Sequence, residues 1–217
     1  EWLIGSPANL KSEIEKEIGG IVPFTFVPEP PARKGDFYNL NKCWNELFRH
    51  AKGELIVNIV DGLWLPSDVL SSFVAHYEAN PKACITTVGN QYDETLTLVL
   101  WKDPRMRMDL GSFYQVEFTE MELCLASFPK QAVIDCKGIK EVYDQGAAMS
   151  EKCMMLQINK LGYSLWIDQS IQYKAIYHPR IAGKEEWDRH YAIACELFDK
   201  HFEEIKQGRG LYGDLGA

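Results

Sequence analysis

Apolar residues recur along this chain at two kinds of spacing, and the alternation of the two predicts its secondary structure. Between residues 37 and 51 they fall three or four positions apart, which is the spacing of one buried face of an α-helix. The run 55–60 is short and rich in β-branched residues, which is typical of a strand covered on both faces. Because segments of both kinds alternate along the chain, we predict an α/β fold with a mostly parallel sheet flanked by helices.

The same patterns place the remaining elements. Further strands are expected at 2–4, 21–27, 83–88, 95–101, 111–118, 163–167 and 171–177. Further helices are expected at 10–18, from Pro66 onward, and at 129–133, 149–161 and 184–206. The glycine-rich tail after Gly208 is expected to be mobile. The chain then divides into a main domain over residues 1–182 and a C-terminal helix with its tail over residues 183–217.

Composition and charge exclude several classes of protein. The 217 residues carry a net charge of −8, and the basic residues are scattered, so we expect no binding to nucleic acid. No apolar run approaches the ~20 residues of a membrane span, so we expect no transmembrane segment. The six cysteines lack metal-site spacing and are expected as free thiols, which suits a cytoplasmic protein.

Asp61 is the first residue with candidate chemistry. It directly follows the strand 55–60, and open α/β sheets place their ligands at the carboxyl ends of strands. A carboxylate there can hold a divalent cation against a diphosphate. A plain Asp61-Gly62 turn explains the same two residues without any ligand, so both interpretations stay open.

The surrounding sequence resembles glycosyltransferase family 2, whose members have the GT-A fold, a Rossmann-like arrangement. Ala51-Lys52-Gly53-Glu54 leads into a strand, and Pro66 follows it, as in the family pattern of A-x-G-E, a strand ending in D-x-D, and a proline-initiated helix. Counted back from Pro66, Asp61 matches the second, metal-binding acid, whereas Ile59 stands at the first. The resemblance implies Mn2+ or Mg2+ as cofactor and the following donor-binding residues: Asp61, Gly62, Asn45, Lys34 and Ser6.

Glu151 is the candidate catalytic residue. The family pattern E-D-x-D-L-x-x-R-L-x-x-x-G-Y carries the catalytic base at its second acid, and anchoring on Gly162-Tyr163 puts Glu151 at that position. A carboxylate at a helix N-terminus can accept the proton of an attacking hydroxyl. The alternative is an ordinary helix-start glutamate that the helix dipole stabilises.

Other residues are candidates for the acceptor side and the metal. By resemblance, the stretch 128–141 borders the acceptor, and Gly146 would allow substrate to approach closely. Trp166, Asp168 and Trp101 suit contact with a sugar, although core packing explains such residues equally well. His178 lies where family members often place a histidine that completes the metal shell, or it is a lone surface histidine.

The resemblance implies an inverting, hexosyltransferase-like enzyme. It would transfer a sugar from a nucleotide-sugar donor, with a UDP-sugar favoured, to a saccharide or another hydroxyl acceptor. Residues 1–6 correspond to the second strand of the family, so the first strand and helix of the nucleotide-binding part are expected to be missing. A GT-A-like binding module without catalysis is the alternative. A nucleotidyltransferase would need a glycine-rich basic phosphate loop, which the sequence does not show.

Overall fold

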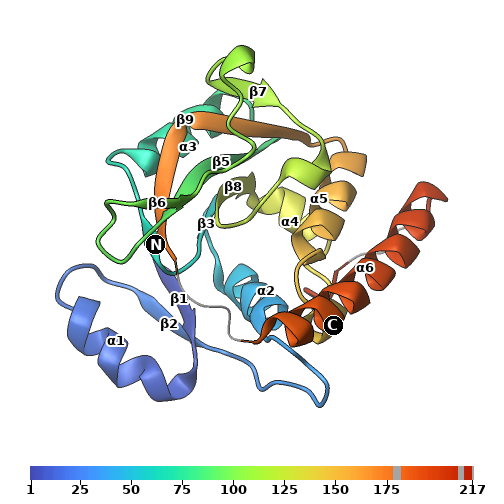
Figure 1. Cartoon of the computed structure of the whole chain (residues 1–217), viewed down its shortest axis with the longest axis horizontal. Helices are drawn as coiled ribbons and strands as arrows, with labels where there is room; N and C mark the ends of the chain where they lie inside the picture. The colour runs from blue at the N-terminus through green and yellow to red at the C-terminus, as the bar shows by residue number, and fades with distance from the viewer. Residues whose placement is uncertain (178–181, 210–212, 217) are drawn as a thin grey trace.

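The computed structural model describes residues 1–177, 182–209 and 213–216, and its strands form two sheets (Figure 1). The smaller sheet pairs β1 (Leu3–Ser6) with β2 (Thr25–Pro28) in parallel, and the segment between them forms η1 (Ala8–Leu10) and α1 (Lys11–Ile18). After a loop comes α2 (Leu40–His50), whose Trp44 and Phe48 are buried as their spacing predicts.

Within the described residues, the larger sheet has seven strands in the order β3-β8-β5-β9-β4, with β6 beside β5 and β7 beside β9. Only the β5–β9 pair is parallel, and the other pairs in this sheet are antiparallel. The seven strands are β3 (Leu55–Ile59), β4 (Leu63–Trp64), β5 (Ala83–Tyr92), β6 (Val99–Trp101), β7 (Phe113–Gln115), β8 (Leu125–Pro129) and β9 (Ser164–Ile176).

The α/β class is confirmed, but the prediction of a mostly parallel sheet is wrong. A parallel neighbour needs a crossover connection, usually a helix. The segment 99–129, which the structure describes throughout, carries β6, β7 and β8 with only the short 3-10 helices η2 (Met108–Leu110) and η3 (Phe118–Glu120) between them. The expected strands 163–167 and 171–177 are also one strand, β9, which pairs with β5 through an irregularity at Thr87 and Val88.

The prediction that the run 55–60 is a central strand is wrong as well, because β3 is an edge strand. Among the described strands it pairs only with β8. Lys130 N donates to Glu54 O at 2.7 Å and Val60 N donates to Cys124 O at 2.9 Å, so the even-numbered residues turn their backbone groups toward β8. The backbone N–H and C=O groups of residues 55, 57 and 59 therefore point away from β8, toward an open edge of the sheet.

The smaller sheet has an open edge of its own along β1, and α2 packs against both sheets. Thr25 N donates to Trp2 O, and Glu29 N donates to Ser6 O, so the backbone groups of residues 3 and 5 point away from β2. A Cβ added to Gly5 would lie 2.5 Å from Cys43 Sγ of α2. On its other side, α2 places Phe48 edge-on to Phe128 of β8, with ring centroids 5.8 Å apart.

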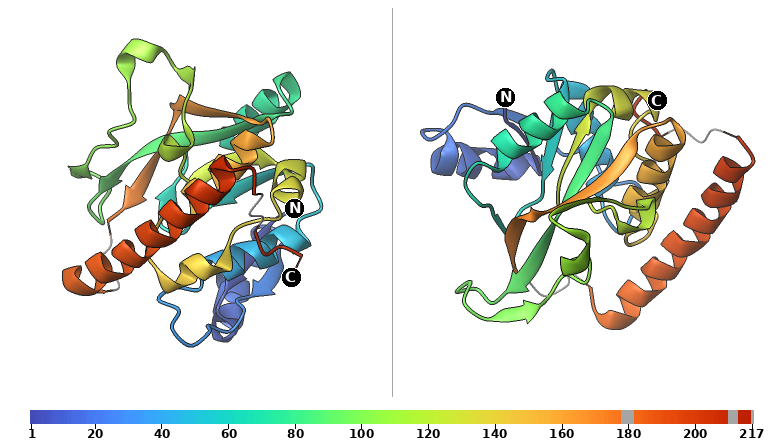
Figure 2. Two further views of the ribbon diagram at one scale, coloured as in Figure 1. Left: turned by 90° about the vertical axis from the view of Figure 1, so that its right-hand side faces the viewer. Right: turned by 90° about the horizontal axis from the view of Figure 1, so that it is seen from above.

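Helices cover both faces of the larger sheet (Figure 2). On one face, α3 (Val69–Ala79) buries Val69 and Phe73 against β5 and β9. On the other face lie α2, α4 (Lys130–Asp135) and α5 (Ser150–Lys160), which form the larger core cluster. The helix predicted from Pro66 begins only at Val69, because Asp68 adopts a left-handed conformation with a φ of 62°. Leu70 and Val74, on the outer side of this helix, are exposed.

The C-terminal helix α6 (Lys184–Lys206) forms as predicted and packs against α5 and η4 (Glu141–Gln145), burying Ala194 and Ile205. The tail behind it makes backbone contacts where it is described, at 213–216. Gly213 N donates to Cys136 O at 2.9 Å, and Leu215 N donates to Lys137 O at 2.8 Å. These backbone bonds hold the tail beside the C-terminal end of α4.

The composition also gave expectations about membrane spans and about the cysteines. Across the described ranges, no helix is both long and apolar enough to cross a membrane. All six cysteines are free thiols, and Cys84, Cys136 and Cys153 are buried.

Candidate functional site

Asp61 lies in an exposed turn that connects β3 to β4. The preceding Val60 bonds to Cys124, and continuing the β3–β8 register places Asp61 opposite Leu123. On the other side of the turn, Gly62 O accepts a hydrogen bond of 3.0 Å from Ile176 N of β9. Among the described residues, Asp61 has no hydrogen-bond or ion-pair partner.

Glu151 lies in the first turn of α5 and is partly exposed. Ser150 Oγ donates to its carboxylate at 3.3 Å. Burial, and after it the carboxylates of Glu122 and Glu151, raise the pKa of the Cys124 thiol to about 11, so Glu151 lies within electrostatic range of the segment that faces the Asp61 turn. Residues 122–124 therefore lie near both carboxylates: Asp61 is opposite Leu123 in the strand register, and Glu151 is within electrostatic range of Cys124.

The structure adds a charged group to this neighbourhood that sequence reasoning missed. Arg105 forms a two-pronged pair with the buried Asp103, with nitrogen–oxygen distances of 3.0 Å and 2.6 Å, and it lies 3.1 Å from a carboxylate oxygen of Glu122. Burial opposes the charge, but the hydrogen bonds to Asp103 and the charge of Glu122 keep the pKa of Arg105 above its ordinary value. The only local signal in the sequence is the Asp103-Pro104-Arg105 turn.

The described side chains do not by themselves form a metal site. In the ranges that the structure covers, no three His, Cys, Asp or Glu side chains are close enough together to hold an ion. Ile59, which stands in place of the first family acid, packs instead against the apolar cluster beneath α3. Glu122 is close to Asp61 by register, but it is paired with Arg105. The candidate ligand His178 lies outside the described residues.

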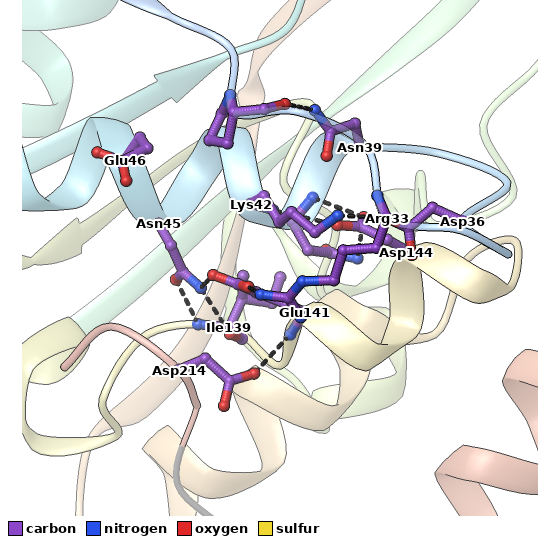
Figure 3. A network of polar contacts seen from close by, with 12 residues as sticks. Arg33, Asp36, Asn39, Lys42, Asn45, Glu46, Ile139, Glu141, Asp144 and Asp214 are labelled. Atoms are coloured by element: carbon purple, nitrogen blue, oxygen red, sulfur yellow. Dashed lines mark hydrogen bonds and ion pairs between the residues drawn. The ribbon is translucent and has the colours of Figure 1, made fainter. Parts of the chain in front are cut away.

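Asn45 was expected to contact the donor, and the structure gives it a different role. Its side chain is fully buried: Nδ2 donates to Ile139 O at 2.9 Å, and Oδ1 accepts from Ile139 N at 3.0 Å (Figure 3). Nδ2 also lies 3.2 Å from Glu141 Oε1. Since every polar atom of the amide binds the protein, Asn45 fastens α2 to the segment before η4 and has no group left for a nucleotide.

Asp144 fixes the N-terminus of α2 within the same network (Figure 3). Its carboxylate accepts hydrogen bonds from the backbone N–H groups of Asn41 at 2.9 Å and Lys42 at 3.3 Å. These are unpaired donors of the first helical turn, so Asp144 acts as a cap supplied from another element. Burial raises the pKa of Asp144 to about 6, although the two backbone bonds and the ammonium of Lys42 oppose the rise. Lys42 is itself buried in an ion pair with Asp36.

Two other donor-side candidates lie on the smaller-sheet side of the chain. Ser6 ends β1, is partly buried and accepts a backbone bond of 2.9 Å from Glu29 N. Lys34 is exposed in the loop between β2 and α2. Neither contacts Asp61 or Gly62 through any hydrogen bond or ion pair that the described residues show, so their place in a donor site stays a prediction.

The acceptor-side candidates are held in packing contacts. Gly146 lies against α6, where an added Cβ would be 2.8 Å from the Cβ of Ala194, so helix packing explains this glycine rather than access for substrate. Asp168 is buried and bonded to His76 Nε2 at 2.7 Å, while Trp166 stacks on Phe113 with centroids 4.8 Å apart. Both belong to the first half of β9. Asp168 pairs with Thr87 and Ile176 pairs with Tyr92, so these two residues of β9 are about 17 Å apart along the sheet, at ~3.3 Å per residue of β5.

No protein-family model matches the sequence, and no curated protein matches it. Solved structures match its fold at low sequence identity. GalNAc-T7 in complex with UDP, GalNAc and Mn2+ matches at a TM-score of 0.58 and 14% identity, covering 98% of this chain and 46% of that one. S. aureus TarS in complex with UDP-GlcNAc matches at 0.60 and 8% identity, covering 92% of this chain and 56% of that one.

A mannosyltransferase from Pyrobaculum calidifontis, PcManGT in complex with GDP-Man and Mn2+, matches at a TM-score of 0.59 and 15% identity, covering 94% of this chain and 54% of that one. The chain therefore spans about half the length of these three proteins. This chain has the GT-A fold that these glycosyltransferases share.

Proposed function

We propose that this chain transfers a sugar from a nucleotide-sugar donor, a UDP-sugar being favoured, to a hydroxyl acceptor with inversion at the anomeric carbon. The observation that carries the proposal is the pair of carboxylates, Asp61 and Glu151, that both lie near residues 122–124 in a GT-A fold. A carboxylate with no partner among the described residues and a carboxylate in the first turn of a helix are suited to different tasks.

In this mechanism Glu151 accepts the proton of the attacking hydroxyl. The acceptor oxygen forms a bond to the anomeric carbon from the face opposite the nucleotide. The bond from that carbon to the phosphate oxygen breaks, and the nucleoside diphosphate leaves with the electron pair. Asp61 lies at the donor side, where it is the described residue that would contact a Mn2+ or Mg2+ ion brought with the diphosphate.

We also propose that the nucleotide side of the site is incomplete in this chain. The open edges of β1 and β3 both lie beside α2, and the carboxylate of Glu1 accepts hydrogen bonds from the backbone N–H groups of Lys52 and Gly53, at the start of β3. β1 and β3 therefore begin close together. The apolar side chains of β3 stay only partly buried beside this edge, which favours one more strand between the two sheets.

Calorimetric titration with UDP and GDP, each with and without Mn2+, tests the donor side. We expect binding that requires Mn2+ and weakens about tenfold in Asp61→Ala, because that change removes a ligand of the ion. Asp109→Ala is the matched control, since Asp109 is an equally exposed carboxylate in η2, away from the strand ends. Binding that is unchanged in Asp61→Ala would remove this residue from the donor site.

A binding module without catalysis is the second candidate function, and Ile59 favours it. A strictly metal-assisted transferase would need a second acid near Asp61, and the structure has a partly buried isoleucine there, packed against an apolar cluster. Mass spectrometry of reactions with UDP-glucose, UDP-GlcNAc and GDP-mannose distinguishes the two functions. Donor that binds but is neither hydrolysed nor transferred would support the binding module.

A further inference from the structure

No described helix covers one end of the larger sheet on the face that α5 covers elsewhere. The strand register places Trp64 of β4 beside Lys174 of β9, and Ile176 of β9 beside Tyr92 of β5. Tyr92 is in turn paired with Val99 of β6. Residues of β5 and β9 alternate between faces, and Cys84 and Val88, on the same face as Tyr92, belong to the core beneath α5. We call Trp64, Tyr92, Val99, Lys174 and Ile176 the aromatic strip.

The aromatic strip is open to solvent. Trp64 is 64% exposed, the highest value of any tryptophan in the chain, and Ile176 and Val99 are 39% and 37% exposed. The ammonium of Lys174 lies 5.1 Å from the centre of the Tyr92 ring, so a cation stands within the apolar surface. Single exposed apolar residues are ordinary, but a contiguous group across four strands indicates a surface that binds something.

The aromatic strip adjoins both candidate reacting groups. Trp64 follows Asp61 by three residues, and Ile176 N bonds to Gly62 O within the Asp61 turn. On the other side, α5 leads into β9 through a short turn and packs against it, so the two run in opposite directions. An eleven-residue helix is about 16 Å long, so its N-terminus with Glu151 lies level with about Asp168, which by the β5 register is three positions, about 10 Å, from Lys174 of the strip.

We propose that the aromatic strip is the acceptor platform and that the acceptor is a saccharide, an inference that rests on the proposed transferase function. A pyranose ring has an apolar C–H face that packs on an indole or phenol ring, and its hydroxyls accept hydrogen bonds from an ammonium group. Trp64, Tyr92 and Lys174 supply both kinds of contact side by side. A saccharide lying along the strip would present a hydroxyl between Asp61 and Glu151.

The test is direct binding of saccharides to the full chain, without nucleotide. The probes are cellohexaose, chitohexaose, maltohexaose, mannohexaose and a hyaluronan hexasaccharide. Their binding is measured by calorimetry and by tryptophan fluorescence. At least one is expected to bind, and Trp64→Ala is expected to weaken it about tenfold because the ring that stacks on the sugar is lost. Trp101→Ala is the matched control: Trp101 is 43% exposed on the same part of the sheet, but it pairs with Gln91 on the opposite face. Circular dichroism confirms that both variants fold.

Three results would overturn the proposal: no binding of any hexasaccharide, equal weakening in the two variants, or no weakening in Trp64→Ala. A dimer that dissociates in Trp64→Ala, or binding to phosphatidylcholine–phosphatidylglycerol vesicles that is lost in it, would also overturn it by assigning the strip to a second copy or to lipid. If the proposed transferase function were wrong, the binding results would differ from those that overturn the acceptor platform. UDP and GDP would then not bind with Mn2+, whereas Trp64-dependent saccharide binding would persist.

Discussion

Replacing Asp144 with asparagine is expected to change how the stability of the chain depends on pH. The Asp144 carboxyl is fully buried against the N-terminus of α2, and burial raises its pKa from 3.8 to about 6. The folded chain therefore holds the proton of this group more tightly than the unfolded chain. The stability that this proton provides is fully present below about pH 4 and is lost as the pH rises through 6.

The magnitude follows from the size of the shift. At about 1.4 kcal/mol per pKa unit, a rise from 3.8 to about 6 corresponds to about 3 kcal/mol of unfolding free energy. Asparagine keeps one oxygen that can accept the backbone N–H bonds of α2, but it does not ionise. The unfolding free energy of the natural chain minus that of Asp144→Asn is therefore expected to fall by up to about 3 kcal/mol between pH 4 and pH 7.

Urea unfolding followed by circular dichroism, at intervals across that pH range, measures the difference. Other titrating groups contribute equally to both proteins, so their effects cancel. Asp109→Asn, at an exposed carboxylate in η2, is the control and is expected to give a flat difference. A difference that rises with pH would show that the helix N-terminus and Lys42 outweigh burial, and that result would refute the reasoning.

Two further predictions concern the candidate base and the contact between Gly146 and α6. Glu151→Gln is expected to abolish sugar transfer while leaving UDP affinity within about twofold, because the amide cannot take the proton of the acceptor hydroxyl. Single-turnover assays measure the transfer and calorimetry measures the affinity. Unchanged turnover would exclude Glu151 as the base. Gly146→Ala is expected to destabilise the chain by about 1–3 kcal/mol, since its Cβ would lie 2.8 Å from Ala194 Cβ. Thermal unfolding measures the loss against Gly20→Ala, whose added Cβ meets nothing within 4 Å, and equal melting temperatures would contradict the packing role.

The sequence alone determined those features that depend on neighbours along the chain. Helix α6 begins and ends at the predicted residues, and α2 buries Trp44 and Phe48 as their four-residue spacing requires. The apolar run 55–60 predicts that Asp61 follows a strand, and β3 does end at Ile59. In each case the signal is local, because helix periodicity and strand length depend on consecutive residues.

Only the tertiary structure decided the partners of those elements. An apolar run such as 55–59 looks the same at the edge of a sheet as at its centre, so its single neighbour β8 could not be read from it. Asn45 resembles a donor contact in sequence, yet its amide is used up by Ile139, 94 positions away. The Arg105–Glu122 pair and the aromatic strip likewise depend on strand register, which long-range hydrogen bonds fix and which no local spacing encodes.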